Sequence, residues 1–206
     1  MALLTAAEAK EAITGLSGTG SDTLLDKLIA AVGVAIATHL GYPRKDATTD
    51  ASVETLTYTW YSGGNNGRVQ VDGRKLILPA RPVTSVTSVY DDADQGYAAA
   101  TLVTSTDYTT DAVDGSIRLL PSATHGGWST SEYAIKVVAV CGFTTIPTDI
   151  KFAARWCVRH WWEINGRGLS EQISAEGVSI TPPTIAIPKP AKDLLKDYRM
   201  ASGWCA

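Results

Sequence analysis

The residues that could carry chemistry are few and widely spaced. Cys157 and His160 lie three positions apart in a stretch that predicts a helix, where a thiol and an imidazole could share a metal ion or act as nucleophile and base. A structural zinc needs four ligands, and Cys141 is the only further obvious candidate. A catalytic dyad needs an orienting third group and an activated thiolate, whereas Cys157 is predicted to face the core. We therefore predict neither site, and we interpret His39, within an apolar stripe, as a core or interface histidine.

Two further stretches resemble ligand-binding loops without completing them. Residues 91–96 (Asp-Asp-Ala-Asp-Gln-Gly) resemble the start of a calcium loop, but Gly96 takes the place of the third ligand and Val103 that of the bidentate glutamate. The glycine-rich stretch 63–67 lacks the Lys-Ser or Lys-Thr of a phosphate loop. No nucleophile elbow or pair of catalytic carboxylates occurs. The sequence predicts no cofactor, no metal and no enzymatic activity.

The composition narrows the class of protein. The chain has 206 residues, 45% of them hydrophobic and 19% charged, with a formal net charge of −3. This length can bury a substantial core, and the low charged share suggests that partners cover part of the surface. The charge argues against tight nucleic-acid binding, and three widely spaced cysteines suit a reducing compartment. No apolar run approaches the roughly 20 residues of a membrane span, so no membrane partner is predicted.

Residues 1–47 predict two helices. Thr5-Ala6-Ala7-Glu8 is a capping box that begins the first, and Ser21 can cap the second. The second helix ends at Gly41, before Tyr42-Pro43. It carries an apolar stripe at helical spacing that consists of Leu24, Leu25, Leu28, Ile29, Val32, Ile36 and Leu40.

The opposite face of this second helix is unusual because Asp26 and Lys27 are its only charges. Its small apolar residues are Ala30, Ala31, Val34 and Ala37. Solvated helix faces normally carry more charge. Either a neighbouring copy of the chain covers this face, with Ala30, Val34 and Ala37 at the contact, or the helix is buried within one domain; the sequence favours neither.

Residues 48–146 predict a β-rich insertion made of short strands separated by turn residues. The Asn66-Gly67 pair is a strong hairpin signal. The predicted strands are 53–60, 68–71, 75–78, 83–90, 116–120 and 133–140. No repeat of fixed period is present.

Residues 147–165 predict a long helix that begins at Pro147-Thr148-Asp149. Its apolar face consists of Ile150, Ala154, Cys157, Trp161 and Ile164. Lys151, Arg155 and Arg159 recur every fourth residue on another face and form a basic ridge. This ridge could contact a DNA backbone, pair with a neighbouring subunit or be solvated. Residues 166–206 then predict a loop, a proline-interrupted apolar segment and a last short helix.

The order of these parts resembles the head–tail connector, or adaptor, family of long-tailed bacteriophages, in its longer form with a β-rich insertion. The resemblance covers nearly the whole chain. The motifs that carry it are the Leu40-Gly41-Tyr42-Pro43 helix end, Leu78-Pro79-Ala80-Arg81-Pro82-Val83 before a strand, the Ile146-Pro147-Thr148-Asp149-Ile150 helix start and the ending Leu194-Leu195-Lys196-Asp197-Tyr198-Arg199.

The resemblance implies an α+β fold. A small helical bundle, made of the N-terminal helices (1–47) and the long helix near 148–165, would carry the β-rich insertion (48–146) and an extended C-terminal tail (166–206) ending in a short helix. It implies a structural virion protein of the neck, present in the host cytoplasm during assembly. A homo-oligomeric ring, dodecameric on the portal protein, would extend the DNA channel and link the capsid to a stopper or tail-completion protein. Genome DNA would pass through without sequence-specific binding.

In such proteins the C-terminal segment commonly attaches the subunit to the portal. Carried onto this chain, the docking residues would be Ile180, Ile185, Ile187, Leu194, Leu195, Tyr198, Arg199 and Trp204. The segment is too apolar to float in water and, with four prolines between 182 and 190, too irregular to form its own core.

Two alternatives remain open. One is a stopper or tail-completion protein of the same neck. The other, from a different class, is a carbohydrate-binding or hydrolytic β-rich module that would use Trp60, Tyr61 and Trp128 as exposed aromatic residues.

Overall fold

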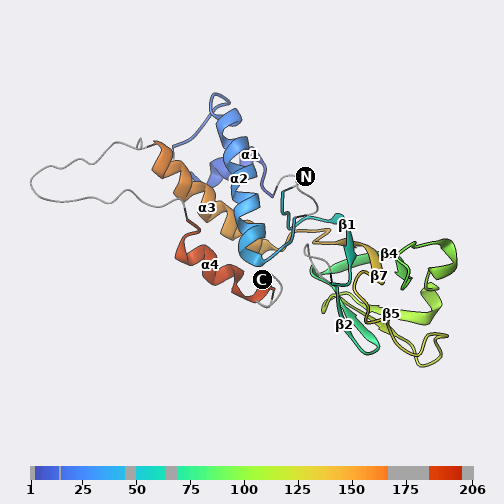
Figure 1. Cartoon of the computed structure of the whole chain (residues 1–206). Coiled ribbons are helices and arrows are strands. Elements are labelled where there is room, and N and C mark those ends of the chain that lie inside the picture. Colours follow the sequence, from blue (N-terminus) through green and yellow to red (C-terminus); the bar gives the residue numbers. More distant parts are fainter. Residues whose placement is uncertain (1–2, 14, 45–49, 64–68, 167–185, 201–206) are drawn as a thin grey trace, which may run out of the picture. The chain divides into compact units, whose positions relative to one another are not determined.

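A computed structural model describes residues 3–13, 15–44, 50–63, 69–166 and 186–200, and it divides the chain into two compact units (Figure 1). The helical unit comprises Met1–Ile36 and Ile146–Tyr198, and the β unit comprises Ala37–Thr145 and Arg199–Ala206. The first of these units contains helices and the second contains the strands. The boundary lies within the second helix, rather than after residue 47, because the last turn of that helix belongs to the β unit.

The first helix, α1 (Ala6–Ala12), begins at the predicted capping box. The amide of Glu8 donates to Thr5 Oγ1 at 3.2 Å, and the amide of Thr5 donates to Glu8 Oε2 at 2.8 Å. These bonds satisfy amides that the helix itself leaves without a partner. The pairing of Thr5 with Glu8 thus sets where α1 starts.

The second helix, α2 (Asp22–Leu40), ends at Gly41, whose φ of +88° is a conformation that glycine adopts readily. Most of its predicted apolar stripe is buried, but Leu24 is 48% exposed. By length and composition, with a mean hydropathy of 1.5, α2 could cross a membrane, contrary to the expectation from sequence that no run approaches this length. Its buried stripe, which includes Leu25 and Ile36, is also what a core helix requires.

Helix α3 (Thr148–Gly166) is the centre of the helical unit, because both α1 and α4 (Lys189–Leu195) pack against it. All the residues of its predicted apolar face are buried: Ile150, Ala154, Cys157, Trp161 and Ile164. The α4 helix buries Ala191 and Leu195, one turn apart, each with 0% of its surface exposed. The predicted short C-terminal helix exists, and its buried side packs against α3 as part of the subunit's core.

The β unit contains two antiparallel sheets within its described residues. The first has the order β1-β7-β4, and the second β2-β3-β6-β5. Their bounds are β1 (Leu56–Tyr61), β2 (Gln70–Asp72), β3 (Lys75–Ile77), β4 (Val83–Asp91), β5 (Tyr108–Asp111), β6 (Ser116–Leu119) and β7 (Ile135–Cys141). Every predicted strand segment overlaps an observed strand, whereas β5 was not predicted as a strand. The predicted Asn66-Gly67 turn lies outside the described residues.

The core of the first sheet follows from strict alternation along β7. Every second residue of that strand, Ile135, Val137, Ala139 and Cys141, is fully buried. On β1, Tyr58 and Trp60 pair with Ala139 and Val137 and stack on each other with ring centroids 4.8 Å apart. The side-chain period of two thus places one continuous apolar face inward.

Candidate functional site

The two cysteines within the described residues, Cys141 and Cys157, are both buried. The side chain of Cys157 is buried, and this burial raises the pKa of its thiol to about 12. Cys141 is buried in the β unit, where desolvation raises its thiol pKa to about 12 as well. Such thiols are neutral at physiological pH and are poor nucleophiles. Within the described residues, no group of three or more His, Cys, Asp or Glu side chains is arranged to hold a metal ion.

The acidic run 91–96 forms a turn organised by Asp92. This carboxylate accepts hydrogen bonds from the amide of Asp94 at 3.0 Å, the amide of Tyr97 at 2.7 Å and the hydroxyl of Thr101 at 3.3 Å. Desolvation raises the pKa of Asp92, but the hydrogen bonds outweigh it and leave the pKa below its ordinary value. Asp92 therefore shapes the loop, as an acidic turn would.

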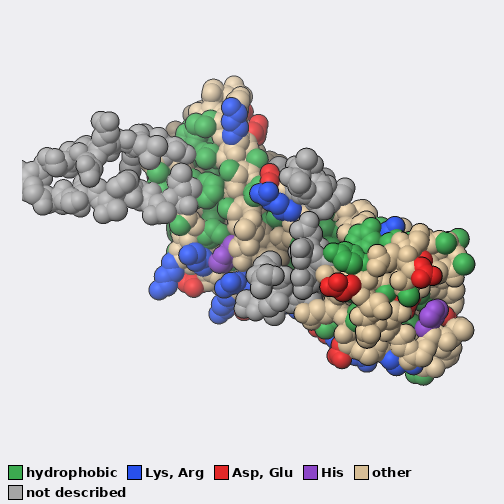
Figure 2. All heavy atoms as spheres, viewed as in Figure 1, with side chains coloured by type: hydrophobic (Ala, Val, Ile, Leu, Met, Phe, Trp, Pro, Cys, Tyr) green, Lys and Arg blue, Asp and Glu red, His purple; other side chains and the backbone are tan. Residues whose placement is uncertain are grey.

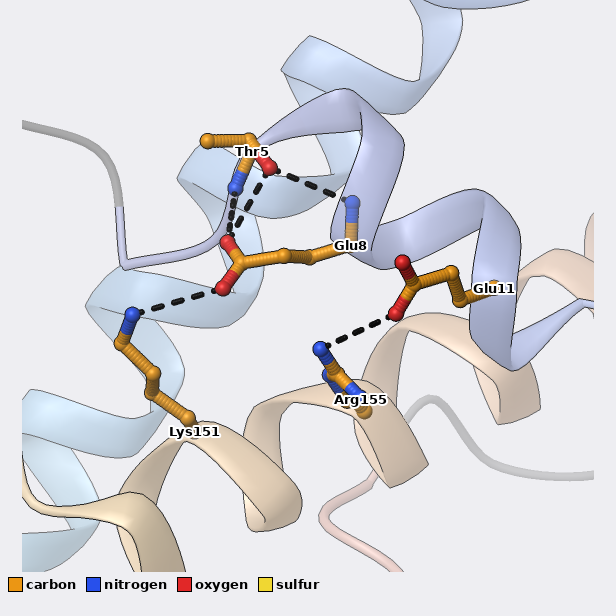
Figure 3. A network of polar contacts seen from close by, with 5 residues as sticks. All are labelled: Thr5, Glu8, Glu11, Lys151 and Arg155. Atoms are coloured by element: carbon orange, nitrogen blue, oxygen red, sulfur yellow. Dashed lines mark hydrogen bonds and ion pairs between the residues drawn. The ribbon is translucent and has the colours of Figure 1, made fainter.

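The basic ridge is paired within its own subunit, and Figure 3 shows the pairs made by Lys151 and Arg155. Lys151 Nζ lies 3.3 Å from Glu8 Oε1, and Arg155 Nη2 lies 3.3 Å from Glu11 Oε2, so both cations contact α1. Arg159 Nε contacts Glu163 Oε1 at 2.9 Å, one turn along α3. This pairing differs from the three expected partners, which were DNA, a neighbouring subunit and solvent.

The ion pairs change what the ridge can do. Exposed pairs contribute about 0–1 kcal/mol to stability, so their main effect is on surface charge. Each cation has a carboxylate beside it, and the ridge presents alternating charges instead of a uniform positive field. The arrangement gives little support for phosphate binding, which needs clustered unpaired cations.

The predicted contact face of α2 is accessible only in part. Ala30 and Ala31 are exposed and Val34 is half-buried, whereas Ala37 has 0% of its surface exposed. Ala37 therefore cannot contact another subunit in this conformation, and its inclusion in the predicted interface is wrong. Near the end of α2, Ile36, Ala37 and Leu40 are all buried, so the enclosed side of the helix includes Ala37.

The predicted portal-docking residues have different environments. Leu195 is fully buried, so it belongs to the core formed with α3 and is not a docking residue. Ile187 and Leu194 are half-buried, and Arg199 is exposed. The hydroxyl of half-buried Tyr198 donates to Asp149 Oδ2 at 3.2 Å. The remaining three, Ile180, Ile185 and Trp204, lie outside the described residues.

The aromatic residues invoked for carbohydrate binding are mostly internal. Trp60 is 3% exposed and Trp128 is 5% exposed, and the Trp128 indole donates to the carbonyl of Arg74 at 3.0 Å. Half-buried Tyr61 packs against Tyr97 with ring centroids 5.6 Å apart. The expected platform of exposed rings is therefore absent from the described part of the β unit, and the carbohydrate-binding alternative loses its basis.

Sequence reasoning missed an exposed aromatic surface on α3. Phe152 is 49% exposed and Trp156 is 44% exposed. A hollow of about 280 Å³ on one side of Trp156 is lined by Glu11, Ala12, Phe152, Arg155, Trp156 and Arg159. A second, of about 300 Å³, is lined by Trp156, Arg159, His160, Glu163, Pro188 and Pro190. We call these two hollows together the α3 groove. The signal was available, since Phe152 and Trp156 lie off the apolar face of α3.

Comparisons with known proteins agree with this picture of a non-catalytic chain. Residues 2–201 match the head completion protein family. No curated protein matches the chain. Among solved structures, a chain from the neck of an empty gene transfer agent particle, computed with C6 symmetry, has 16% identity and a TM-score of 0.58, covering 98% of this chain and 93% of its own.

Two further structures share the fold. A chain of the virion of the native gene transfer agent particle has 16% identity and a TM-score of 0.55, with 97% of this chain and 90% of its own covered. A chain from the neck of the native particle, computed with C12 symmetry, has 15% identity and a TM-score of 0.51, with 96% and 91% covered. The α+β fold class and the resemblance to phage connectors are confirmed. The chain belongs to the head completion protein family, the members of which are structural proteins of the phage particle and not enzymes.

Proposed function

We propose that this chain is an adaptor of the virion neck, a ring-forming subunit that binds beneath the portal. The ring would be dodecameric, would extend the DNA channel and would connect the filled capsid to a stopper or tail-completion protein. Genome DNA would pass through without sequence-specific contacts. The subunit itself would be made in the host cytoplasm and incorporated during assembly.

The observation that carries this proposal is the family match over residues 2–201. Two structures of similar fold come from necks of gene transfer agent particles, computed with C6 and C12 symmetry. Cyclic symmetry is what a collar around a DNA channel requires. The order of helices, β-rich insertion and helices favours the adaptor over the stopper.

The surface chemistry of the helical unit is compatible with this role. The paired ridge of Lys151, Arg155 and Arg159 offers no strong field to hold DNA. Leu195 is buried in the core, so other residues must contact the portal. Accessible candidates near it are Ile187, Leu194 and Arg199. The apolar residues at positions 180, 185 and 204 are further candidates. Segments of this kind usually bind by strand addition or by packing a helix into a groove.

The test is made on particles. Heads assembled without this chain should package DNA and remain tailless, and the purified chain should restore tail attachment. Imaging of the restored neck distinguishes the two roles: an adaptor lies directly against the portal, whereas a stopper lies one layer further from the head. Heads that acquire tails without the chain would refute a neck function.

A further inference from the structure

We propose that the α3 groove of one subunit receives the exposed face of α2 from the adjacent copy in the ring. This inference rests on the proposed ring function. In a closed ring of identical subunits, each copy uses two different surfaces, one toward each neighbour. Among its described residues, the helical unit exposes large apolar side chains in two places: Phe152 with Trp156 on α3, and Leu24 on α2. Figure 2 shows hydrophobic side chains at the surface of this unit.

The two surfaces have complementary shapes. The α3 groove consists of hollows on both sides of a protruding Trp156. The exposed face of α2 has a large side chain, Leu24, followed by the small residues Ala30 and Ala31. Leu24 and Ala31 are about 10 Å apart along the helix axis. Leu24 can therefore fill one hollow while the indole of Trp156 lies against the alanines. Lys27 is exposed on the same face between Leu24 and Ala31, and its aliphatic stem can lie along the apolar surface while its ammonium reaches the edge of the groove.

Charges on the two surfaces also match. Asp26 and Lys27 are exposed on α2, and neither has an ion-pair partner among the described residues. The groove is bordered by Arg159, whose side chain is 47% exposed, and by Glu11, whose side chain is 66% exposed. A guanidinium has five N–H donors, so Arg159 can bind a second carboxylate while it keeps Glu163. Asp26 would approach Arg159, and Lys27 would approach Glu11.

Cross-linking between copies tests the contact directly. In a Cys205→Ser background, Ala30→Cys and Trp156→Cys are prepared as separate proteins, while buried Cys141 and Cys157 are retained. After assembly on portal rings and mild oxidation, we expect a disulfide-linked dimer only when the two proteins are mixed. The double variant should give a ladder of head-to-tail multimers. A dimer from either single variant alone would indicate a self-complementary interface and would overturn the proposal.

A second measurement does not depend on introduced cysteines. We expect Trp156→Glu to raise the apparent dissociation constant for ring assembly by about 30-fold or more, as expected for an interface residue worth about 2 kcal/mol. Leu102→Glu is the matched control, because Leu102 is 44% exposed like Trp156 but lies in the β unit. Circular dichroism checks that both variants fold.

The outcomes separate this contact from the function on which it rests. Wild-type rings that form normally, but give no cross-link and tolerate Trp156→Glu, would overturn the α2–α3 contact alone. A wild-type chain that never assembles with portal rings would overturn the proposed function and the contact with it.

Discussion

Replacing Leu195 with alanine tests whether the end of the chain belongs to the subunit's core. Leu195 is 0% exposed, and Ala191, one turn earlier, is also 0% exposed, so the inner face of α4 is tightly enclosed against α3. Removing a buried leucine side chain costs about 2–5 kcal/mol, from lost transfer free energy and the cavity left behind. We expect about 3 kcal/mol, a large part of the roughly 5–15 kcal/mol that stabilises a typical domain.

Urea unfolding followed by the helical circular dichroism signal measures this loss. With a slope of about 1–3 kcal/mol/M, the midpoint should fall by roughly 1–3 M. Lys192→Ala on the same helix is the control, because Lys192 is exposed and its loss should change stability by no more than about 0.5 kcal/mol. If Leu195→Ala unfolded at the same urea concentration as this control, α4 would not be part of the core. The helix would then be free to dock on the portal, as the sequence predicts for residues 166–206.

Three further outcomes follow from contacts within the two units. The hydrogen bond from the Thr5 amide lowers the pKa of Glu8 below 4.5. The ionised carboxylate therefore stabilises the fold above pH 4.5, and this contribution is lost as the pH falls through the lowered value. The unfolding free energy of Glu8→Gln should depend less on pH below 4.5 than that of the wild type. Burial raises the pKa of both the Cys141 and the Cys157 thiols to about 12, so iodoacetamide should react slowly with either in the native protein. Peptide mass spectrometry measures the labelling, and rapid labelling of either thiol would contradict its burial. Ala37→Glu places a charge at a fully buried position and should yield misfolded protein by circular dichroism, whereas Ala30→Glu should fold; equal stability of the two would contradict the burial of Ala37.

Local signals in the sequence were enough to predict most elements. The capping box fixed the start of α1, and a glycine at position 41 fixed the end of α2. Alternation along residues 133–140 predicted β7, whose inner side chains are fully buried. These features depend on interactions between residues close in sequence, so the sequence pattern alone is enough to predict them. Strand β5 was missed because Tyr108–Asp111 has little apolar alternation and forms by pairing with β6.

Contacts between distant parts of the chain could not be predicted in this way. Lys151 and Glu8 are 143 residues apart, so the basic ridge was assigned external partners although its carboxylates lie within the same subunit. The prolines near α4 suggested a segment without its own core, but Pro188 and Pro190 stand at the start of the helix, where proline is well tolerated. Trp60 and Trp128 look like exposed binding aromatics in the sequence, yet both are buried, and the Trp128 indole donates to the carbonyl of Arg74.

Folding and assembly use different faces of the same helices in this subunit. On α3, Ile150 and Cys157 are buried in the core, while Phe152 and Trp156 are about half exposed two to six positions from Ile150. On α2, Leu25 is buried beside exposed Leu24. A half-exposed large apolar side chain gives the isolated subunit only part of its burial energy. Complete burial contributes about 1.5–3 kcal/mol, so covering the exposed half in an assembly can add roughly half of that. Substitutions at the exposed positions should therefore impair assembly without unfolding the subunit, and substitutions at their buried neighbours should do the reverse.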